Sequence, residues 1–125
     1  MNVPKNLRYT KEHEWALIEG KTATIGITEY AQGELGDIVF VQLPSIGQKI
    51  EQMKACANIE AVKAVSDLFA PVSGSVTAVN NDLESDPQLI NKDPYGKGWI
   101  LKVELSNPKE ADSLLSPDDY QTLIH

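Results

Sequence analysis

Short runs of strand-forming residues, each ended by a turn signal, recur along this 125-residue sequence and constrain its fold most strongly. Outside the middle of the chain, these runs lie at residues 14–19, 22–27, 37–43, 75–79 and 99–103. Gly20, Pro44 and Gly47 interrupt the runs where the backbone must turn. The first two runs flank Gly20 closely enough to form a hairpin. Many short strands separated by regular turns are typical of a sandwich or barrel, so we expect a mainly β fold.

Short helices are expected at the edges of the sheets and in the tail. Thr28 is suited to cap a helix that ends at Leu35. Asp86 and Pro87 have the residue types of a cap and a first helical turn, which predicts a helix from there to Ile90. The tail carries two further caps and the apolar positions of helices packed on a sheet, namely Asn107 and Ser116, and Leu114, Leu115, Tyr120, Leu123 and Ile124.

The middle of the chain places one lysine between two further strand patterns. Upstream, residues 56–61 alternate in polarity with the period of a half-buried strand. Downstream, residues 65–69 are also rich in strand formers, and Pro71 then marks a turn. If the two runs pair as a hairpin, Lys63 lies at or beside its tip.

The composition of that tip is unusual for a tight turn. Hairpin turns favour Gly, Asn or Asp because the backbone needs a positive φ there, and none of these occurs between Glu60 and Ala64. Val62 is β-branched, which makes it a poor turn residue. A place where the sequence breaks a local rule is often a functional one. The residues alone leave open the alternative that Lys63 is an ordinary solvated surface charge.

The charge of the chain argues against several classes of partner. Its 18 acidic and 11 basic residues give a net charge of −7 and a pI near 4.7, a balance that repels nucleic-acid phosphates and anionic lipids. We therefore expect no nucleic-acid partner and no membrane partner. No apolar run approaches membrane-spanning length, and residues 1–5 lack the features of a leader. We expect a cytoplasmic protein of bacterial type, with a mature mitochondrial form as the alternative.

Metal and nucleophilic chemistry find little support in the sequence. The single cysteine, Cys56, allows no internal disulfide and falls within a strand pattern, so we expect it to act as a small buried hydrophobe. His13 and His125 are too few for a zinc-type site. No nucleotide-binding or nucleophile motif occurs, and neighbouring carboxylates such as Glu12 and Glu14 are interpreted as solvated unless a cleft contains them. What remains is a non-catalytic carrier in which a modified side chain supplies the chemistry.

Several unrelated motifs together resemble the H protein of the glycine cleavage system. They are YTKEHEW at 9–15, ATIGIT at 23–28, AQ at 31–32, LGDIVFV at 35–41, EAVKA at 60–64, SD at 66–67, SG at 73–74, VN at 79–80, NKDPYG at 91–96 and GW at 98–99. The match runs from about residue 7 to residue 124, in the family's order and with its gaps. Because the motifs are independent of one another, the resemblance is specific.

The resemblance implies a single lipoyl-carrier domain over residues 1–125 with a lipoyl/biotinyl-type barrel-sandwich hybrid fold. In this fold, two antiparallel sheets are accompanied by short helices and a C-terminal helix, and the modified lysine lies at a hairpin tip. The resemblance also implies that Lys63 carries lipoate in amide linkage, as N6-lipoyllysine. A lipoate-attaching enzyme would recognise the presented strand–turn–strand, which gives the unusual tip composition a reason.

Three further enzymes are the partners that the resemblance implies. A pyridoxal-phosphate glycine decarboxylase (P protein) removes CO₂ from glycine and passes the aminomethyl group to the lipoyl disulfide. A tetrahydrofolate-dependent aminomethyltransferase (T protein) takes the methylene carbon and releases ammonia, and a flavin dihydrolipoamide dehydrogenase (L protein) reoxidises the dithiol. Lys63 does no acid–base work, because its modified arm only moves one group between sites and raises its local concentration. We expect the carrier to be a monomer.

The family also holds the loaded arm in a cleft of the H protein, which shields it from water. Glu14 and Asp67 are our candidates for holding the cationic amine there, because opposite charges in a partly dry cleft attract strongly. Glu34 stands where some members carry histidine, which puts an imidazole role at that position in doubt. Asn58 replaces a usual apolar residue, and we expect it simply to face solvent. No residue is expected to be catalytic or to bind a metal.

Other carriers and a plain binding module are the alternatives. Biotin carriers frame their lysine with methionine on both sides, whereas Val62 and Ala64 flank Lys63. Lipoyl domains of 2-oxoacid dehydrogenases share a glutamate three residues before the lysine, but they are shorter and lack the block at 9–15 and the helical tail. The alternative function is that of an H-like protein that relays lipoate or acts as an unmodified interaction module, because such a protein would keep Lys63 as well.

Overall fold

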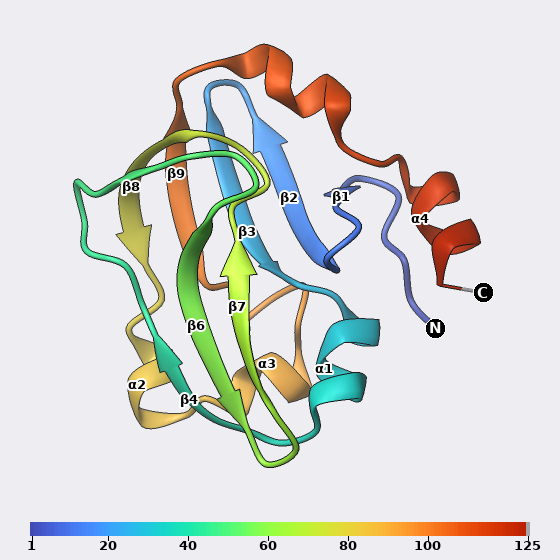
Figure 1. Cartoon of the computed structure of the whole chain (residues 1–125), viewed down its shortest axis with the longest axis vertical. Coiled ribbons are helices and arrows are strands. Elements are labelled where there is room, and N and C mark those ends of the chain that lie inside the picture. Colours follow the sequence, from blue (N-terminus) through green and yellow to red (C-terminus); the bar gives the residue numbers. More distant parts are fainter. Residues whose placement is uncertain (125) are drawn as a thin grey trace.

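Two antiparallel β-sheets form the body of the molecule in the computed structural model, which describes residues 1–124 (Figure 1). The strands are β1 (Arg8–Tyr9), β2 (Glu14–Glu19), β3 (Thr22–Ile27), β4 (Ile38–Gln42), β5 (Lys49–Ile50), β6 (Ala55–Ala61), β7 (Val65–Phe69), β8 (Gly74–Val79) and β9 (Leu101–Leu105). The helices are α1 (Glu29–Leu35), α2 (Asp82–Ser85), α3 (Leu89–Lys92) and α4 (Pro117–Leu123), with a 3-10 helix at Pro108–Ser113.

The two sheets differ in size, and the smaller one presents the central hairpin. The larger sheet has the strand order β1-β2-β3-β9-β8-β5, and the smaller one has the order β4-β6-β7. The turn between β6 and β7 lies at the extreme end of the molecule, below the body in Figure 1. The predicted mainly β fold, with two antiparallel sheets, short helices and a C-terminal helix, is confirmed.

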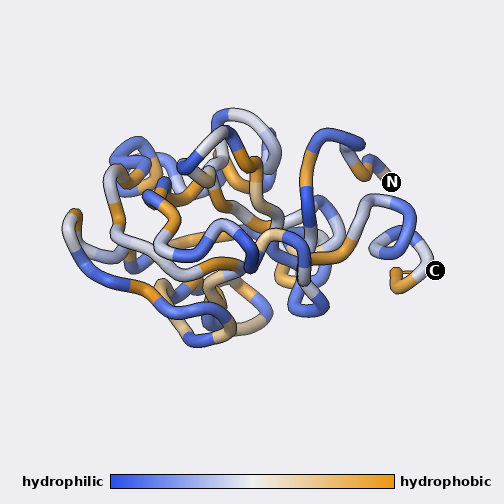
Figure 2. Tube along the Cα trace, turned by 90° about the horizontal axis from the view of Figure 1, so that it is seen from above, coloured by the Kyte–Doolittle hydropathy of each residue, from blue (hydrophilic) through white to orange (hydrophobic). Residues whose placement is uncertain are grey.

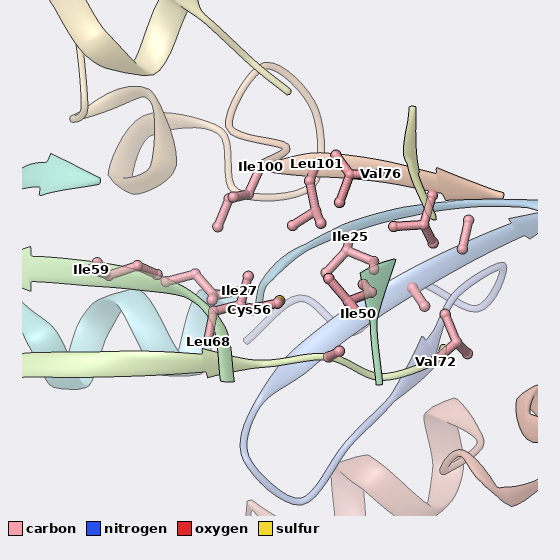
Figure 3. Close-up of a cluster of buried hydrophobic side chains, with 14 of the residues drawn as sticks. Ile25, Ile27, Ile50, Cys56, Ile59, Leu68, Val72, Val76, Ile100 and Leu101 are labelled. Atoms are coloured by element: carbon pink, nitrogen blue, oxygen red, sulfur yellow. The ribbon is translucent and has the colours of Figure 1, made fainter. Parts of the chain in front are cut away.

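The main hydrophobic core lies between the two sheets (Figure 3). Ile59 and Leu68 from the smaller sheet and Ile25 and Leu101 from the larger one are almost completely buried. Burying such a side chain stabilises the fold by roughly 1.5–3 kcal/mol. Cys56 belongs to the same cluster, and burial raises the pKa of its thiol to about 12. Its predicted role as a small buried hydrophobe is confirmed.

A second apolar cluster ties the C-terminal helix to the first strands. Tyr9 from β1 and Tyr120 from α4 are fully buried, and their rings stack with centroids 4.6 Å apart. Leu7 and Trp15 complete the buried cluster, and Nε1 of Trp15 donates a hydrogen bond to the carbonyl oxygen of Pro94 at 3.0 Å. The N-terminal segment and α4 therefore lie at the same end of the molecule, as the view from above also shows (Figure 2).

The last strand begins later than the sequence pattern predicts. β9 starts at Leu101, whereas the expected strand covered residues 99–103. The side-chain Nδ2 of Asn80 donates to the carbonyl oxygens of Lys97 and Trp99, both at 2.8 Å. Because these side-chain bonds engage the carbonyl oxygens just before β9, the regular ladder of backbone hydrogen bonds starts only at Leu101.

The helix predicted at 86–90 is wrong in its start. Asp86 instead ends α2, with φ −140° and ψ 74°, and α3 begins at Leu89. A residue that precedes proline disfavours the helical conformation, which accounts for the end of α2 at Asp86. Pro87 and Gln88 then form a turn, in which the N–H groups of Leu89 and Ile90 donate to the carbonyl oxygens of Asp86 and Pro87, so α3 covers only Leu89–Lys92. The short helix α2 was not predicted at all.

The tail is helical as predicted, but three of its apolar positions differ from the prediction. Leu114 and Leu115 lie after the 3-10 helix, and Leu115 is only half-buried and pairs through its backbone with Tyr9. Asn107 and Ser116 cap the 3-10 helix and α4 by accepting backbone N–H groups. Leu123, however, is 47% exposed. At about 100° per residue it lies roughly 60° to one side of Tyr120, whereas Ile124 lies closer to the buried face.

Candidate functional site

Lys63 lies at the tip of the β6–β7 hairpin, as predicted. The N–H of Ala61 donates to the carbonyl oxygen of Ala64 at 2.8 Å, and Val62 and Lys63 occupy the two positions between them. Both of these side chains are exposed. The backbone of the tip is therefore closed by a hydrogen bond while the lysine is presented to solvent.

The backbone of the tip contains no positive φ angle at Val62 or Lys63, a conformation that these residue types disfavour. Among the non-glycine residues that the structure describes, positive φ occurs only at His13 and Met53, so neither Val62 nor Lys63 carries left-handed strain. The N–H of Val62 donates to the carbonyl oxygen of Asp37 at 3.0 Å. A neighbouring segment thus supports the turn in place of turn-forming residues.

The side chain of Lys63 crosses the backbone at the end of α1. Gly36 ends this helix with a φ of 81°, and its N–H donates to the carbonyl oxygen of Gln32. Methylene carbons of Lys63 lie 3.4–3.5 Å from the position that a Cβ on Gly36 would occupy. The positive φ and the close approach both favour glycine here, so the end of α1 leaves space for the lysine stem.

A cleft of about 200 Å³ lies among α1, the start of β2 and the β6–β7 hairpin. It is lined by polar residues Glu12, His13, Glu14, Glu34, Ser66 and Asp67 and by apolar residues Ile27, Ala31, Leu35 and Ile59. Glu14 from β2 and Asp67 from β7 thus line the same cleft, and Asp67 lies on the hairpin whose tip carries Lys63. A hollow of about 230 Å³ is lined by residues 55–58 at the end of β6 away from Lys63, whereas hollows of about 290 and 490 Å³ receive no residue from this hairpin.

Glu14 is a deeply buried carboxyl group, with 2% of the residue exposed. One of its oxygens accepts a hydrogen bond from the hydroxyl of Thr10, and Oε2 accepts the N–H of Phe69 at 3.1 Å. Burial raises the pKa of Glu14 to about 7, because desolvation outweighs the two hydrogen bonds, which lower the pKa. The exception stated for neighbouring carboxylates therefore applies, because a cleft contains both Glu12 and Glu14, and Glu14 is buried in it while Glu12 is exposed.

Asp67 differs from Glu14 in that it is exposed on the edge strand β7. Its cross-strand partner is Asn58 on β6, whose Nδ2 donates to Asp67 Oδ1 at 3.1 Å. Asn58 is half-buried, so the expectation that it simply faces solvent is wrong: it orients a carboxylate of the cleft. Glu34, also exposed, lines the opposite wall from α1.

His13 joins the cleft to the C-terminal helix, a link that the sequence did not predict. His13 Nδ1 lies 2.8 Å from Tyr120 Oη, which lies 2.7 Å from Thr28 Oγ1. Thr28 is fully buried and accepts the N–H of Ala31, and within the described residues Tyr120 is the only acceptor for its hydroxyl proton. Tyr120 then donates its own proton to Nδ1, which leaves a neutral ring with its N–H at Nε2. Burial lowers the pKa of His13, in agreement with a neutral ring.

Replacement of Tyr120 by Phe is expected to release His13 from this single tautomer. Nδ1 would lose its donor and the buried hydroxyl of Thr28 its acceptor, so we expect a loss of about 1–2 kcal/mol in the free energy of unfolding. In ¹⁵N NMR spectra the His13 ring should change from the Nε2–H form to a mixture of tautomers, and its pKa should rise. The control is Tyr30→Phe, because the rings of Tyr30 and His13 lie with their centroids 4.7 Å apart but Tyr30 forms no hydrogen bond with Nδ1. Unchanged His13 resonances in Tyr120→Phe would contradict the assigned hydrogen-bond direction.

Two further features of residues 1–124 bear on function. No helix in this part of the chain is long and apolar enough to cross a membrane. Nor do three or more His, Cys, Asp or Glu side chains gather there in an arrangement that could hold a metal ion.

Comparisons with known proteins agree on one family. A family model described as glycine cleavage H-protein matches residues 7–125. The glycine cleavage system H protein of Carboxydothermus hydrogenoformans is 54% identical over 122 residues, covering 98% of this chain and 94% of that protein. The H protein of Symbiobacterium thermophilum is 56% identical over 119 residues, with coverage of 95% and 93%. The crystal structure of an H protein from Mycobacterium marinum matches with a TM-score of 0.87 at 39% identity, covering 95% of this chain and 96% of that one.

Proposed function

Because this chain belongs to the glycine cleavage H-protein family, we propose that it is the lipoyl carrier of the glycine cleavage system, with lipoate in amide linkage to Nζ of Lys63. The observation that carries the proposal is the position of Lys63. It is exposed at the tip of a hairpin whose strands also line a cleft with a buried carboxyl group. A group attached to the lysine can therefore reach outward to a partner or lie back against the protein.

The tip fits a covalently attached group. Acylation needs an accessible amine, and among the described residues Nζ of Lys63 takes part in no salt bridge. The Ala61–Ala64 and Val62–Asp37 hydrogen bonds fix the backbone below it. The freedom of motion thus resides in the side chain and its arm, which keeps the effective concentration of the carried group high near its partners.

Held on Lys63, lipoate would supply a disulfide that can accept an aminomethyl group on one of its sulfur atoms and can be restored from the dithiol by a two-electron oxidation. The partners we propose for this chemistry are a glycine decarboxylase (P protein), which would form the aminomethyl group from glycine with loss of CO₂, an aminomethyltransferase (T protein), which would pass its methylene carbon to tetrahydrofolate with release of ammonia, and dihydrolipoamide dehydrogenase (L protein), which would oxidise the dithiol. The chain itself performs none of these reactions. We assign to it one non-catalytic, monomeric and cytoplasmic lipoyl-carrier domain over residues 1–125.

The residues of the chain act by binding and by excluding water. Glu14 and Asp67 approach the same cleft from β2 and β7. We assign to them the binding of the cationic amine, because a positive charge in a partly dry cleft is attracted by carboxylates. The apolar wall, with Ile27 and Ile59, excludes water from the carried group.

Asp67→Asn is expected to shorten the lifetime of the loaded carrier. Since Asp67 is exposed, loss of its charge should raise the rate of ammonia release in the absence of tetrahydrofolate only about two- to fivefold. The control is Asp37→Asn, which removes an exposed carboxylate that does not line the cleft. Equal lifetimes for Asp67→Asn and the unchanged protein would remove Asp67 from the binding role.

A lipoate relay to other proteins is the competing function. A relay would need the exposed Lys63 but has no use for a cleft that binds a cationic group, so the buried Glu14 favours the carrier. The discriminating experiment is glycine decarboxylation reconstituted with the three enzymes and the lipoylated chain. We expect sustained turnover that depends on this chain. Absence of turnover with fully lipoylated protein would favour the relay.

A further inference from the structure

The cleft beside the central hairpin is rich in hydrogen-bond acceptors and poor in donors. Four of its six polar lining residues carry carboxyl groups, namely Glu12, Glu14, Glu34 and Asp67. The hydroxyl of Ser66 donates to the carbonyl oxygen of Asp67 at 3.2 Å, so it has an acceptor within the protein. His13 is the remaining polar residue, and its ring is the group that can offer an N–H to a ligand in the cleft.

The hydrogen bonds of His13 leave this N–H at Nε2. Nδ1 accepts the hydroxyl proton of Tyr120, whose oxygen accepts that of Thr28. Tyr120 is fully buried, stacks on Tyr9 and does not line the cleft. Within residues 1–124, no buried side-chain nitrogen or oxygen atom lacks a hydrogen-bond partner, and Nε2 forms no hydrogen bond. Since His13 is only half-buried, Nε2 therefore lies at its accessible surface.

The backbone of His13 also fixes the position of the ring. Its φ of 69° lies in a region that residues other than glycine seldom occupy. The N–H of His13 donates to the carbonyl oxygen of Thr10 at 3.1 Å, and its own carbonyl oxygen accepts the N–H of Thr28 at 3.0 Å. An unfavourable conformation that neighbouring bonds maintain is often found at functional sites. Here it holds the ring at the N-terminal end of α1, beside Tyr30.

Lys63 and His13 lie at opposite ends of α1. The stem of Lys63 packs against Gly36, which ends the helix, whereas His13 bonds to Thr28, which caps its start. At roughly 1.5 Å per residue, the helix rises about 12 Å between these two caps. A lysine side chain extended by the octanoyl chain of lipoate is long enough to cover this length. The amide of such an arm would stay near Gly36, and its sulfur atoms would reach the end of the cleft where His13 lies.

The chemistry of a loaded arm matches the two kinds of group in the cleft. A cationic amine only donates hydrogen bonds, so it suits the carboxylates and not an N–H. The sulfur that becomes free when the disulfide opens is an acceptor, which an N–H suits. Burial lowers the pKa of His13 and outweighs the charges of Glu12 and Glu34, which raise it. The neutral ring can therefore donate to a sulfur without repelling the amine.

We propose that the Nε2–H of His13 donates a hydrogen bond to the free sulfur of an opened lipoyl arm, with Tyr120 and Thr28 as the positioning residues that hold this N–H in place. The inference rests on the proposed function and adds to it a residue that binds the sulfur. A hydrogen bond to the charged form of a thiol favours its ionisation. His13 thus offsets the nearby carboxylates, which disfavour a further negative charge, and keeps more of the sulfur as the reactive thiolate.

The test measures the ionisation of the arm thiols in His13→Asn. Asparagine tolerates a positive φ, and its Oδ1 can accept the hydroxyl proton of Tyr120 in place of Nδ1, but its side chain ends short of the position of Nε2. The lipoylated chain is reduced with a phosphine, which becomes the phosphine oxide as the disulfide gains two electrons and two protons. After removal of the phosphine, mass spectrometry follows the rate of alkylation by iodoacetamide as a function of pH.

The pH at which alkylation of the arm reaches half its maximal rate should lie about 0.5–1 pH unit higher in His13→Asn than in the unchanged chain. The control is Tyr30→Phe, which alters a neighbour of the His13 ring without removing a bond to either ring nitrogen, and it should match the unchanged chain. Cys56 does not interfere, because it is buried and burial raises the pKa of its thiol to about 12.

NMR of the unchanged chain gives a second readout that does not depend on the folding of a variant. The proton resonance at Nε2 of His13 should move downfield when the lipoylated chain is reduced. It should stay in place when the chain without lipoate receives the same phosphine. In Tyr120→Phe the movement should be smaller, because the ring no longer holds its proton at Nε2 alone. Far-UV circular dichroism and thermal unfolding establish that the variants are folded.

The outcomes separate this inference from the proposed function. Equal alkylation profiles for folded His13→Asn and the unchanged chain, or an unmoved Nε2 proton on reduction, would show that His13 does not bind the sulfur, although the carrier function would stand. If Lys63 does not accept lipoate at all, the proposed function fails, and this inference fails with it.

Discussion

Lys63→Arg is expected to abolish lipoylation and with it all turnover in the reconstituted glycine cleavage reaction. Arginine keeps the charge and approximate length, but its guanidinium stays protonated and cannot act as the amine nucleophile. The free energy of unfolding should remain within about 0.5 kcal/mol, because Lys63 is exposed and takes part in no salt bridge among the described residues. Intact mass spectrometry and product formation from glycine measure the two effects.

The matched control for this variant is Lys109→Arg, an exposed lysine in the 3-10 helix of the tail. It should be lipoylated and turned over like the unchanged protein. Residual turnover of Lys63→Arg above background would mean that another side chain carries the cofactor and that the hairpin tip is not the site of attachment.

Glu14→Gln is expected to alter the pH dependence of stability more than any other change in the cleft. Burial raises the pKa of Glu14 from its usual 4.5 to about 7. Below pH 4.5 both the folded and the unfolded chain hold the proton. Between pH 4.5 and 7 only the folded chain keeps it, so this contribution to stability is lost as pH rises towards the folded pKa. A shift of this size corresponds to about 3 kcal/mol.

Urea unfolding at pH 4.5 and at pH 8 measures this contribution. The unchanged protein should lose about 3 kcal/mol more than Glu14→Gln between the two values. Glu34→Gln is the control, because Glu34 lines the same cleft but is exposed and is not among the groups that shift the pKa of Glu14, and it should behave like the unchanged protein. Parallel pH profiles for Glu14→Gln and the unchanged protein would show that the folded chain does not shift this carboxyl.

Glu14→Gln should also shorten the lifetime of the loaded carrier, although it loses less stability than the unchanged protein as the pH rises. Gln cannot supply the negative charge that Glu14 provides when it ionises, so the cationic amine should be bound more weakly. We expect the release of ammonia to accelerate about tenfold, which corresponds to a loss of roughly 1.4 kcal/mol in the binding of the amine. Opposite effects on stability and on function are the behaviour expected of a group held in an unfavourable environment for its role.

Local patterns were sufficient for most of the fold. Alternation and turn residues predict the 14–27 hairpin and the central hairpin, and Thr28 predicts the start of α1. These features depend on neighbours a few residues apart. The start of β9 could not be predicted, because it depends on Asn80, whose side chain bonds the backbone of Lys97 and Trp99.

The candidate site was predicted only in part for the same reason. The sequence pattern placed Lys63 at a hairpin tip, whereas its role as the modified lysine was implied by the family resemblance. Glu14 and Asp67 were proposed for the cleft that the resemblance implies, and these two line one cleft. The burial of Glu14 depends on Phe69, 55 residues away, and no periodicity reveals it. The bond between His13 and Tyr120 spans 107 residues, and the only trace of it in the sequence is a tyrosine on an apolar stripe.

The most direct test of the account is intact mass spectrometry of the chain purified from its native host, followed by peptide mapping around Lys63. We expect a mass increase of one lipoyl group, located on Lys63 and absent from the other lysines. A biotinyl group at that position would contradict the cofactor assignment. An unmodified Lys63 in cells that lipoylate their other carriers would contradict the carrier function itself.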